Sequence, residues 1–281
     1  IAAIVHVGIA GYCIRHGALN PDEGFYAAVA RAVYAGHVPY RDFGYTQPPL
    51  LPYINGLFMQ VGRYGLFEQR AINAGWAALA LVLAGYCISR RGTLAIALGS
   101  VMIFTLSAPW MYFTHLGKTY ALTGMLAVWA AWVWLENPDG IKKTCWLGLI
   151  GVLGTGCRLP ALPFFGLLWL GSFWTGRPFS GSRLVVAPAL LLLAAIGLLL
   201  PFYLAAPESS VFWVLGFHRI SVPARAWHLA WQELETLAPT LWLATAIVVV
   251  LTIRRPRFAR SRELFLGAAA LVALCGNLVS A

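Results

Sequence analysis

The segment NPDEGFYAAVARAVYAGHVPYRDFGYTQPPL, residues 20–50, is polar and aromatic in a chain that is otherwise apolar almost from end to end. Hydrophobic residues make up 60% of the chain and charged residues 11%. A typical soluble domain carries about a quarter charged residues, so this composition indicates a surface that faces lipid. We therefore expect residues 20–50 to lie in a loop outside the membrane.

Apolar runs recur along the whole chain, and a membrane-spanning helix needs about 20 apolar residues. We predict an all-α fold: a polytopic transmembrane bundle of about nine spans, forming a single domain over residues 1–281. Because the chain lacks an initiator Met and begins and ends inside apolar runs, we expect it to be truncated at both ends. The predicted spans cover residues 1–14, 68–89, 93–108, 119–135, 145–157, 160–174, 184–205, 236–253 and 264–281.

The run PPLLPYINGLFMQVG, residues 48–62, decides how the chain threads the membrane. It is short and has three prolines at its start, which favours an interfacial or re-entrant helix over a span. With that choice the loops 15–66 and 206–235 share the outer side. The main basic clusters then fall inside, as the positive-inside rule expects. These clusters are Arg90-Arg91, Lys142-Lys143, Arg177 with Arg183, and RRPRFARSR (254–262).

Several function classes have no support in the sequence. The net charge of +10 would suggest nucleic acid in a soluble protein, but the Lys and Arg clusters lie in short gaps between apolar runs, so we expect no nucleic-acid partner. The five cysteines form no CxxC pair and lie in or beside apolar runs, which favours buried small side chains. GVLGTG (151–156) follows no strand and does not predict a nucleotide loop.

Local structure accounts for part of the opening segment. Asn20 can cap a helix with Pro21 at its first position and the acids Asp22 and Glu23 next, a capping-box pattern. The helix is predicted over 21–35. Capping does not explain the later part of the segment. Asp22 and Tyr26 are four residues apart, so a carboxylate and a phenol project from one helix face.

These residues resemble the first outer loop of membrane glycosyltransferases with the GT-C fold. The nearest resemblance is to the family 39 group, which includes protein O-mannosyltransferases and lipid A aminoarabinose transferases. It rests on Asp22-Glu23, Tyr26, the PYRDF block at 39–43 and Pro48-Pro49. It continues more weakly in GTLAIALGSVMIFTLSAPW (92–110), CRLPALPFF (157–165) and VLGFHR (214–219).

The resemblance implies a cell-envelope enzyme that uses a polyprenyl-phosphate sugar donor on the outer face of a membrane. Asp22 would be the catalytic base that takes a proton from the acceptor. Glu23 belongs to the same catalytic pair and would position Asp22 or the acceptor, although its capping position explains it equally well. Tyr26 would lie near the donor phosphate. A single base without a covalent nucleophile predicts inversion at the anomeric carbon.

The sequence departs from the family pattern immediately before the paired prolines. Related loops carry an acid and a Lys there, where this chain has Thr46 and Gln47. Other cations would then have to bind the donor phosphate, and the candidates are Lys118, Arg158, Arg219 and Arg225. The residues expected to position the acceptor or the loop are Asp42, Arg41, Gln47 and His218.

Other interpretations of these residues stay open at this stage. Asp42 could pair with Arg41 on a solvated loop, Lys118 could be an interface anchor, and Arg158 could snorkel to the surface. No cofactor is required, and a divalent cation held by Asp22 and Asp42 is left open. The expected location is the bacterial inner membrane, with the active site facing outward.

The competing function class is a polytopic transporter or a flippase for lipids or glycolipids, without transferase chemistry. Such proteins also carry polar residues near span ends and proline-broken helices. Their sites generally lie near the midplane between internal repeats. Here no repeated half is visible and seven of the ten acids fall on the outer side, which favours chemistry at one membrane face. The sequence does not identify the sugar or the acceptor.

Overall fold

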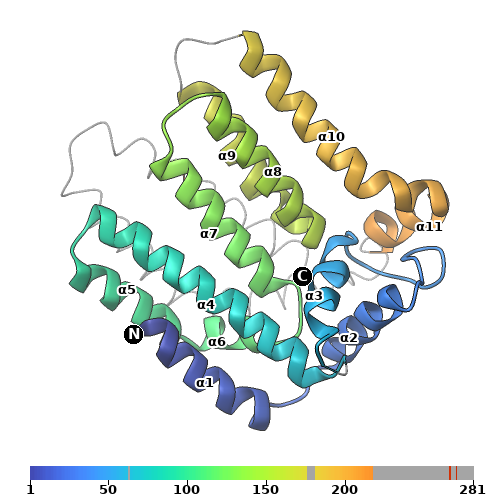
Figure 1. The fold of residues 1–281 in the computed structure, drawn as a ribbon, viewed down its shortest axis with the longest axis horizontal. Coiled ribbons are helices and arrows are strands. Elements are labelled where there is room, and N and C mark those ends of the chain that lie inside the picture. Colours follow the sequence, from blue (N-terminus) through green and yellow to red (C-terminus); the bar gives the residue numbers. More distant parts are fainter. Residues whose placement is uncertain (63, 176–180, 218–265, 267–269, 271–281) are drawn as a thin grey trace, which may run out of the picture.

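The computed structural model of the protein describes residues 1–62, 64–175, 181–217, 266 and 270. Within these ranges the regular elements are all helical, which confirms the all-α prediction there. The helices, labelled in Figure 1, are α1 (Ala2–His16), α2 (Pro21–Tyr34), α3 (Leu50–Met59), α4 (Leu66–Arg91), α5 (Leu94–Leu106), α6 (Ala108–His115), α7 (Tyr120–Glu136), α8 (Ile141–Cys157), α9 (Leu162–Thr175), α10 (Gly181–Ala205) and α11 (Pro207–Val211). A 3₁₀ turn covers Leu159–Ala161 and a π-helical turn, η2, covers Phe212–Gly216.

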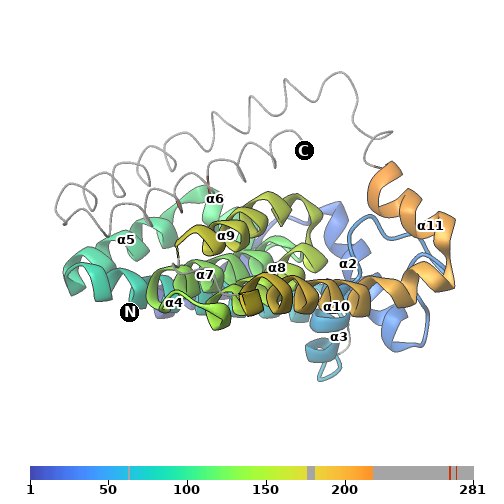
Figure 2. The same ribbon diagram turned by 90° about the horizontal axis from the view of Figure 1, so that it is seen from above.

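The long helices form one main layer. In spatial order α1, α4, α7, α8 and α10 lie side by side, each packed against the next (Figure 1). α5 packs on α1 and α4, while α9 packs on α8 and α7, on one face of this layer in Figure 2. The short helices α2, α3 and α11 gather at one end of the bundle (Figure 1).

The start of α2 forms as its sequence predicts. The Asn20 side chain accepts a hydrogen bond from the backbone N–H of Asp22 at 3.1 Å, and the Glu23 carboxylate accepts one from the backbone N–H of Asn20 at 3.1 Å. These two bonds satisfy N–H groups that a helix start leaves without partners. The helix ends at Tyr34, just before Gly36 at φ +91°, a conformation that favours glycine.

The predicted spans that fall in the described ranges are helices within a few residues of the expected positions. By length and composition, two of them could cross a membrane: α4, with 26 residues, and α10, with 25. α1 and α2 would add a third if they formed one span, but they are bent by 96°. The count of about nine spans therefore stays a prediction. Residues 236–253 and most of 264–281 lie outside the described residues.

Residues 48–62 form only the short helix α3, and its interfacial or re-entrant position stays a prediction. Its ten residues extend about 15 Å, half the thickness of a bilayer's hydrocarbon core. The segment 108–118, between the predicted spans 93–108 and 119–135, contains the helix α6. Its start has Pro109 near the first position, where a proline is compatible with helix.

The two ends of the bundle differ in charge. At one end, which we call the basic end, α4 and α7 finish and α8 and α10 begin. Arg91 at the end of α4 forms an ion pair with Glu136 at the end of α7, and Lys143 pairs with Asp139 at 2.9 Å. At the other end, the loop end, α1, α8 and α10 finish and α4 and α7 begin, beside α2, α3 and α11 (Figure 1).

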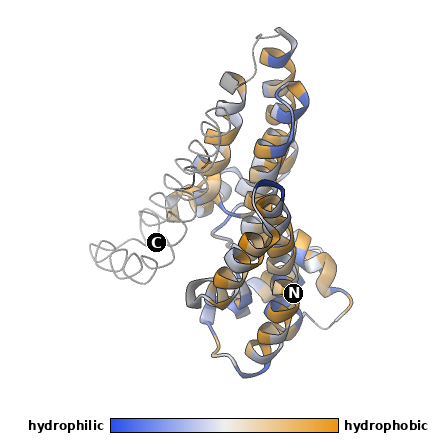
Figure 3. Ribbon diagram, turned by 90° about the vertical axis from the view of Figure 1, so that its left-hand side faces the viewer, coloured by the Kyte–Doolittle hydropathy of each residue, from blue (hydrophilic) through white to orange (hydrophobic). Residues whose placement is uncertain are grey.

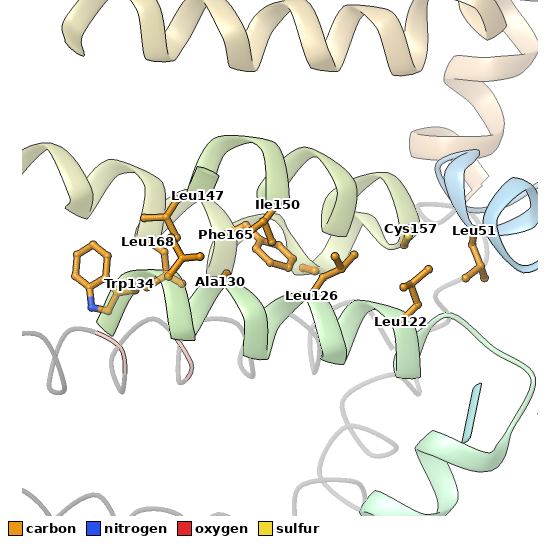
Figure 4. Close-up of a cluster of buried hydrophobic side chains, with 12 residues drawn as sticks. Leu51, Leu122, Leu126, Ala130, Trp134, Leu147, Ile150, Cys157, Phe165 and Leu168 are labelled. Carbon is orange, nitrogen blue, oxygen red and sulfur yellow. The ribbon is translucent and has the colours of Figure 1, made fainter. Parts of the chain in front are cut away.

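A core of apolar side chains joins α7, α8 and α9, with Leu51 of α3 at its edge (Figure 4). Close approach of α8 and α9 requires a glycine, because a Cβ on Gly154 would lie 2.2 Å from the Phe165 ring. Hydrophobic residues run along the helices (Figure 3), and many of the large ones are exposed. Val185 on α10, for example, is 69% exposed, which is compatible with a surface that contacts lipid.

The ends of the bundle yield a testable topology. Cysteines replacing Arg41 and Glu208, both exposed at the loop end, should react with a membrane-impermeant maleimide from one side of sealed vesicles. A cysteine replacing the exposed Lys142 at the basic end should react from the other side. Labelling of the Arg41 and Glu208 positions from opposite sides would contradict the shared outer face of the two loops.

Candidate active site

Asp22 and Lys118, 96 positions apart in sequence, meet at the loop end. The Asp22 carboxylate lies 2.6 Å from the Lys118 ammonium group. Capping of α2 is carried by Asn20 and Glu23, so the Asp22 side chain projects from the helix start and is 60% exposed. The Lys118 side chain is only 16% exposed. The predicted base and one predicted phosphate-binding cation are therefore in direct contact.

The segment that carries Lys118 is held by polar side chains of α4. The Asn73 side-chain amide donates to the carbonyl groups of Leu116 and Lys118, the latter at 3.0 Å, and the Gln69 amide donates to the carbonyl of Gly117. Gln69 and Asn73 are both buried. Buried hydrogen bonds of this kind fix the backbone on which Lys118 is presented.

Glu23 lies in a buried ion pair with Arg70 of α4. Two guanidinium nitrogens of Arg70 donate to its two carboxylate oxygens at 2.7 and 2.6 Å, and the Gly117 backbone N–H donates to it at 2.8 Å. Burial alone would raise the pKa of Glu23, but the hydrogen bonds from Arg70 and from two backbone N–H groups outweigh it and hold the pKa below its usual value.

These contacts assign Glu23 a different task from the one expected. Its carboxylate is fully buried and hydrogen-bonded on both oxygens, so it holds α2, α4 and the segment before α7 together. Of the acidic pair, only Asp22 presents an exposed carboxylate. Glu23 therefore caps α2 and pairs with Arg70, and its carboxylate is not presented to an acceptor.

Arg158 and Tyr26 lie next to the Asp22–Lys118 pair. Arg158 donates to the Thr119 hydroxyl at 3.2 Å, and its guanidinium lies 4.4 Å from the centre of the Tyr120 ring. Thr119 directly follows Lys118, so the two cations approach the same short segment. Burial raises the pKa of Tyr26 to about 12, although the positive charge of Arg158 acts in the opposite direction. Tyr26 is therefore a neutral phenol at physiological pH.

Asp42 and Arg41 form a local turn instead of joining this group. Asp42 accepts two hydrogen bonds from Arg41 at 2.9 and 2.8 Å, and one from the backbone N–H of Val38 at 2.7 Å. Hydrogen bonds from Arg41 and Val38 lower the pKa of Asp42 to about 2. The turn places Tyr40 at φ 68°, a left-handed conformation, with its hydroxyl donating to the Gln47 carbonyl at 2.6 Å.

The contacts of the first loop show what Asp42 and Gln47 do in the structure. Asp42 pairs with Arg41, as the local interpretation allowed, and Gln47 is buried and supports the loop through its backbone. Among the described residues no group of three or more His, Cys, Asp or Glu side chains could hold a metal ion. Asp22 and Asp42 each pair with a different cation, so the two carboxylates do not form a shared ligand set.

His218, Arg219 and Arg225 lie outside the described residues. The preceding part of their loop, through η2, does reach the loop end. Trp213 packs so closely on the loop of residues 38–47 that a Cβ on Gly44 would lie 2.4 Å from the Trp213 ring. The first outer loop and the start of the loop 206–235 are therefore neighbours.

No sequence pattern predicted a role for Arg70, Gln69 or Asn73, although their hydrogen bonds support the site. One signal was available: all three lie at one end of an otherwise apolar helix, and ionisable residues in such helices usually have a partner or a function. Nothing in the sequence identified Glu23, 47 positions away, as the partner of Arg70.

An apolar groove of about 380 Å³ lies between α8, α9 and α10. Leu159, which lines it, directly follows Arg158 in the chain. Pro48 and Val214 also line it, and both belong to loop-end segments. Other lining residues are Gly151, Gly166, Trp169 and Leu198.

Comparisons of the chain with protein-family models, with curated proteins and with solved structures found no match in any of the three searches. An assignment of this chain to a family therefore rests on the resemblance of the first outer loop and on the geometry of the site.

Proposed function

We propose that the protein is a membrane glycosyltransferase of the GT-C type. It transfers a sugar, with inversion, from a polyprenyl-phosphate donor to a hydroxyl or amine group of an acceptor. The observation that carries the proposal is the contact between the exposed carboxylate of Asp22 and Lys118, with Arg158 reaching the adjacent Thr119. A base and two cations from three separate segments are what this transfer needs.

The chemistry follows from these groups. The acceptor O–H or N–H gives its proton to Asp22 as the acceptor atom attacks the anomeric carbon. The bond between that carbon and the phosphate oxygen breaks, and its electron pair stays on the phosphate. Lys118 and Arg158 stabilise the negative charge that develops there. The products are the glycosylated acceptor and polyprenyl phosphate, and the proton on Asp22 is released to water.

Lys118 also accounts for the departure from the family pattern. The Lys that related loops carry before the paired prolines is Gln47 here, and Gln47 is buried beneath Tyr40. Lys118 reaches the same acidic residue from another segment. We infer that it takes over the phosphate contact of the missing Lys.

The apolar groove suits the polyprenyl tail of the donor, because it is lined by apolar side chains, among them Leu159, the residue after Arg158. The proposal includes the full GT-C architecture of about nine spans. The loop end then faces outward from a bacterial inner membrane, where polyprenyl-phosphate sugars are presented. The two long apolar helices support a membrane location, and the cations Arg90, Arg91, Lys142 and Lys143 at the basic end suit the inner face that the positive-inside rule expects.

Filling the groove should impair use of long-chain donors. A Cβ on Gly166 would meet no atom within 4 Å, so Gly166→Leu projects new bulk into the groove without displacing existing side chains. If the leucine displaces two methylenes of the tail, kcat/KM should fall about tenfold. Gly197→Leu on α10 is the matched control, since its Cβ also meets no atom and it does not line the groove. Equal kinetics for both variants would contradict the tail site.

The proposed function is tested by incubating the purified full-length protein with a panel of radiolabelled polyprenyl-phosphate sugars and candidate acceptors. Transfer or hydrolysis from one donor would establish the class and identify the sugar. If no donor turns over although the protein is folded, the transferase assignment fails. Flux of the same lipids across vesicles would then test the flippase alternative.

A further inference from the structure

The two groups with opposite tasks in the proposed reaction neutralise each other in the structure. Asp22 must accept a proton, and Lys118 must hold the donor phosphate, yet the Asp22 carboxylate and the Lys118 ammonium lie 2.6 Å apart. The Asp22 oxygen that contacts the Lys118 ammonium group cannot contact an acceptor O–H or N–H at the same time. The contact therefore masks the base as long as no donor is bound.

The pair is built so that it can exchange partners. Its carboxylate side is 60% exposed, and exposed ion pairs contribute little to stability. The backbone of Lys118 is held by Asn73, so only the flexible side chain has to move. Asp22 stands at a helix start whose capping does not use its side chain, so the helix does not depend on the pair.

A phosphate group would compete for Lys118 on favourable terms. Arg158 donates to Thr119, the residue after Lys118, so a second cation lies on the segment that a phosphate bound to Lys118 would approach. The lysine side chain is also less exposed than the carboxylate, and charge interactions strengthen as water is excluded.

We propose that Lys118 is a phosphate-operated latch on Asp22. Without donor, Lys118 masks the base. The donor phosphate draws Lys118 away, and Asp22 becomes available to the acceptor only then. Donor must therefore bind before acceptor can be activated, and an acceptor without donor meets a neutralised base. This inference rests on the proposed function, because it assumes a phosphate-bearing donor at Lys118.

Carbodiimide cross-linking tests the latch directly, because it forms an amide only between a carboxylate and an amine in contact. The full-length protein without ligand should yield a cross-linked peptide joining Asp22 and Lys118. Farnesyl phosphate at about ten times its Kd should lower the yield roughly tenfold by mass action. Farnesol, which has the same chain without phosphate, should leave the yield unchanged.

Two controls separate the latch from general effects. The Asp139–Lys143 pair at the basic end, with its atoms 2.9 Å apart, should keep its cross-linking yield in farnesyl phosphate. Lys118→Arg keeps a positive charge opposite Asp22 but offers no amine, so it should lose only the Asp22 cross-link.

Binding of radiolabelled farnesyl phosphate is measured in parallel. This measurement distinguishes failure of the latch from failure of the proposed donor class. Bound ligand with an undiminished cross-link overturns the latch alone. A ligand-free protein without the cross-link overturns it as well. Absence of prenyl phosphate binding overturns both the donor class of the proposed function and the latch that depends on it.

Discussion

Asp22→Asn is expected to lower the rate of sugar transfer by about 10²–10⁴-fold, the usual contribution of a general base. Asparagine keeps the size of the side chain but cannot accept the acceptor's proton. The protein should fold normally, because the Asp22 side chain is 60% exposed and α2 is capped by Asn20 and Glu23. The measurement is single-turnover transfer at saturating donor, together with a thermal unfolding midpoint in detergent.

Glu208→Gln provides the matched control for that variant. Glu208 is an exposed carboxylate at the same end of the bundle, in α11, and has no contact with the candidate site among the described residues. Glu208→Gln removes one negative charge, as Asp22→Asn does, so its rate of sugar transfer should match that of the wild type. Full transfer activity in Asp22→Asn would show that Asp22 is not the general base. The role assigned to its contact with Lys118 would then fail as well.

Local sequence signals predicted the parts of the fold that depend on neighbouring residues. The apolar runs predicted helix positions within a few residues for the first seven predicted spans. A helix makes its backbone hydrogen bonds within one segment, so the residues of that segment are enough to locate it. The start of α2 followed from Asn20, Pro21 and Glu23 for the same reason. How the helices line up as a layer depends on surfaces that meet across long sequence distances, and no local pattern encodes it.

The candidate site divides in the same way. Asp22, Tyr26, Lys118 and Arg158 were proposed individually, and the structure brings them together at one end. Asp42 was proposed for acceptor or metal binding on its residue type, but its oxygens are used by Arg41 and by the turn. Residue type could not decide whether Asp42 binds an acceptor or metal or instead pairs with the neighbouring Arg41. Only the geometry of the turn shows that Asp42 pairs with Arg41.

The polar support beneath the site was the part least accessible to sequence. Glu23 had a sufficient local explanation as a capping residue, and that explanation concealed its second contact. One carboxylate oxygen serves the cap, while both oxygens also serve Arg70. A residue that satisfies one local rule can thus carry a long-range role that only the packed structure reveals.

Arg70→Met is expected to destabilise the protein by about 3–5 kcal/mol, the usual cost of leaving one partner of a buried ion pair alone. The Glu23 carboxylate is fully buried and would keep only two backbone N–H donors. The unfolding midpoint in detergent should fall by on the order of 10 °C. Asp42→Asn, which breaks an exposed pair, should leave the midpoint unchanged.

A double-mutant cycle distinguishes an unpaired charge from lost packing. Glu23→Gln removes the buried charge, and its single amide oxygen can still accept from one of the two backbone N–H groups, which meet different carboxylate oxygens in the wild type. Glu23→Gln with Arg70→Met should therefore be more stable than Arg70→Met alone. If the double variant is no more stable, Arg70 acts by packing and by its contacts with the Ala18 carbonyl instead.

Acidification gives an independent measure of the same pair. The pKa of Glu23 is lower in the folded protein than its usual value, so its stabilising contribution is present above the usual pKa and is lost as the pH falls through the folded one. Wild type should therefore lose stability in that acidic range. Glu23→Gln has no carboxylate to protonate there, so its midpoint should fall less over the same interval. Parallel curves for the two proteins would mean that another carboxylate governs the acid response, and that the contacts of Glu23 with Arg70 do not hold its proton affinity down.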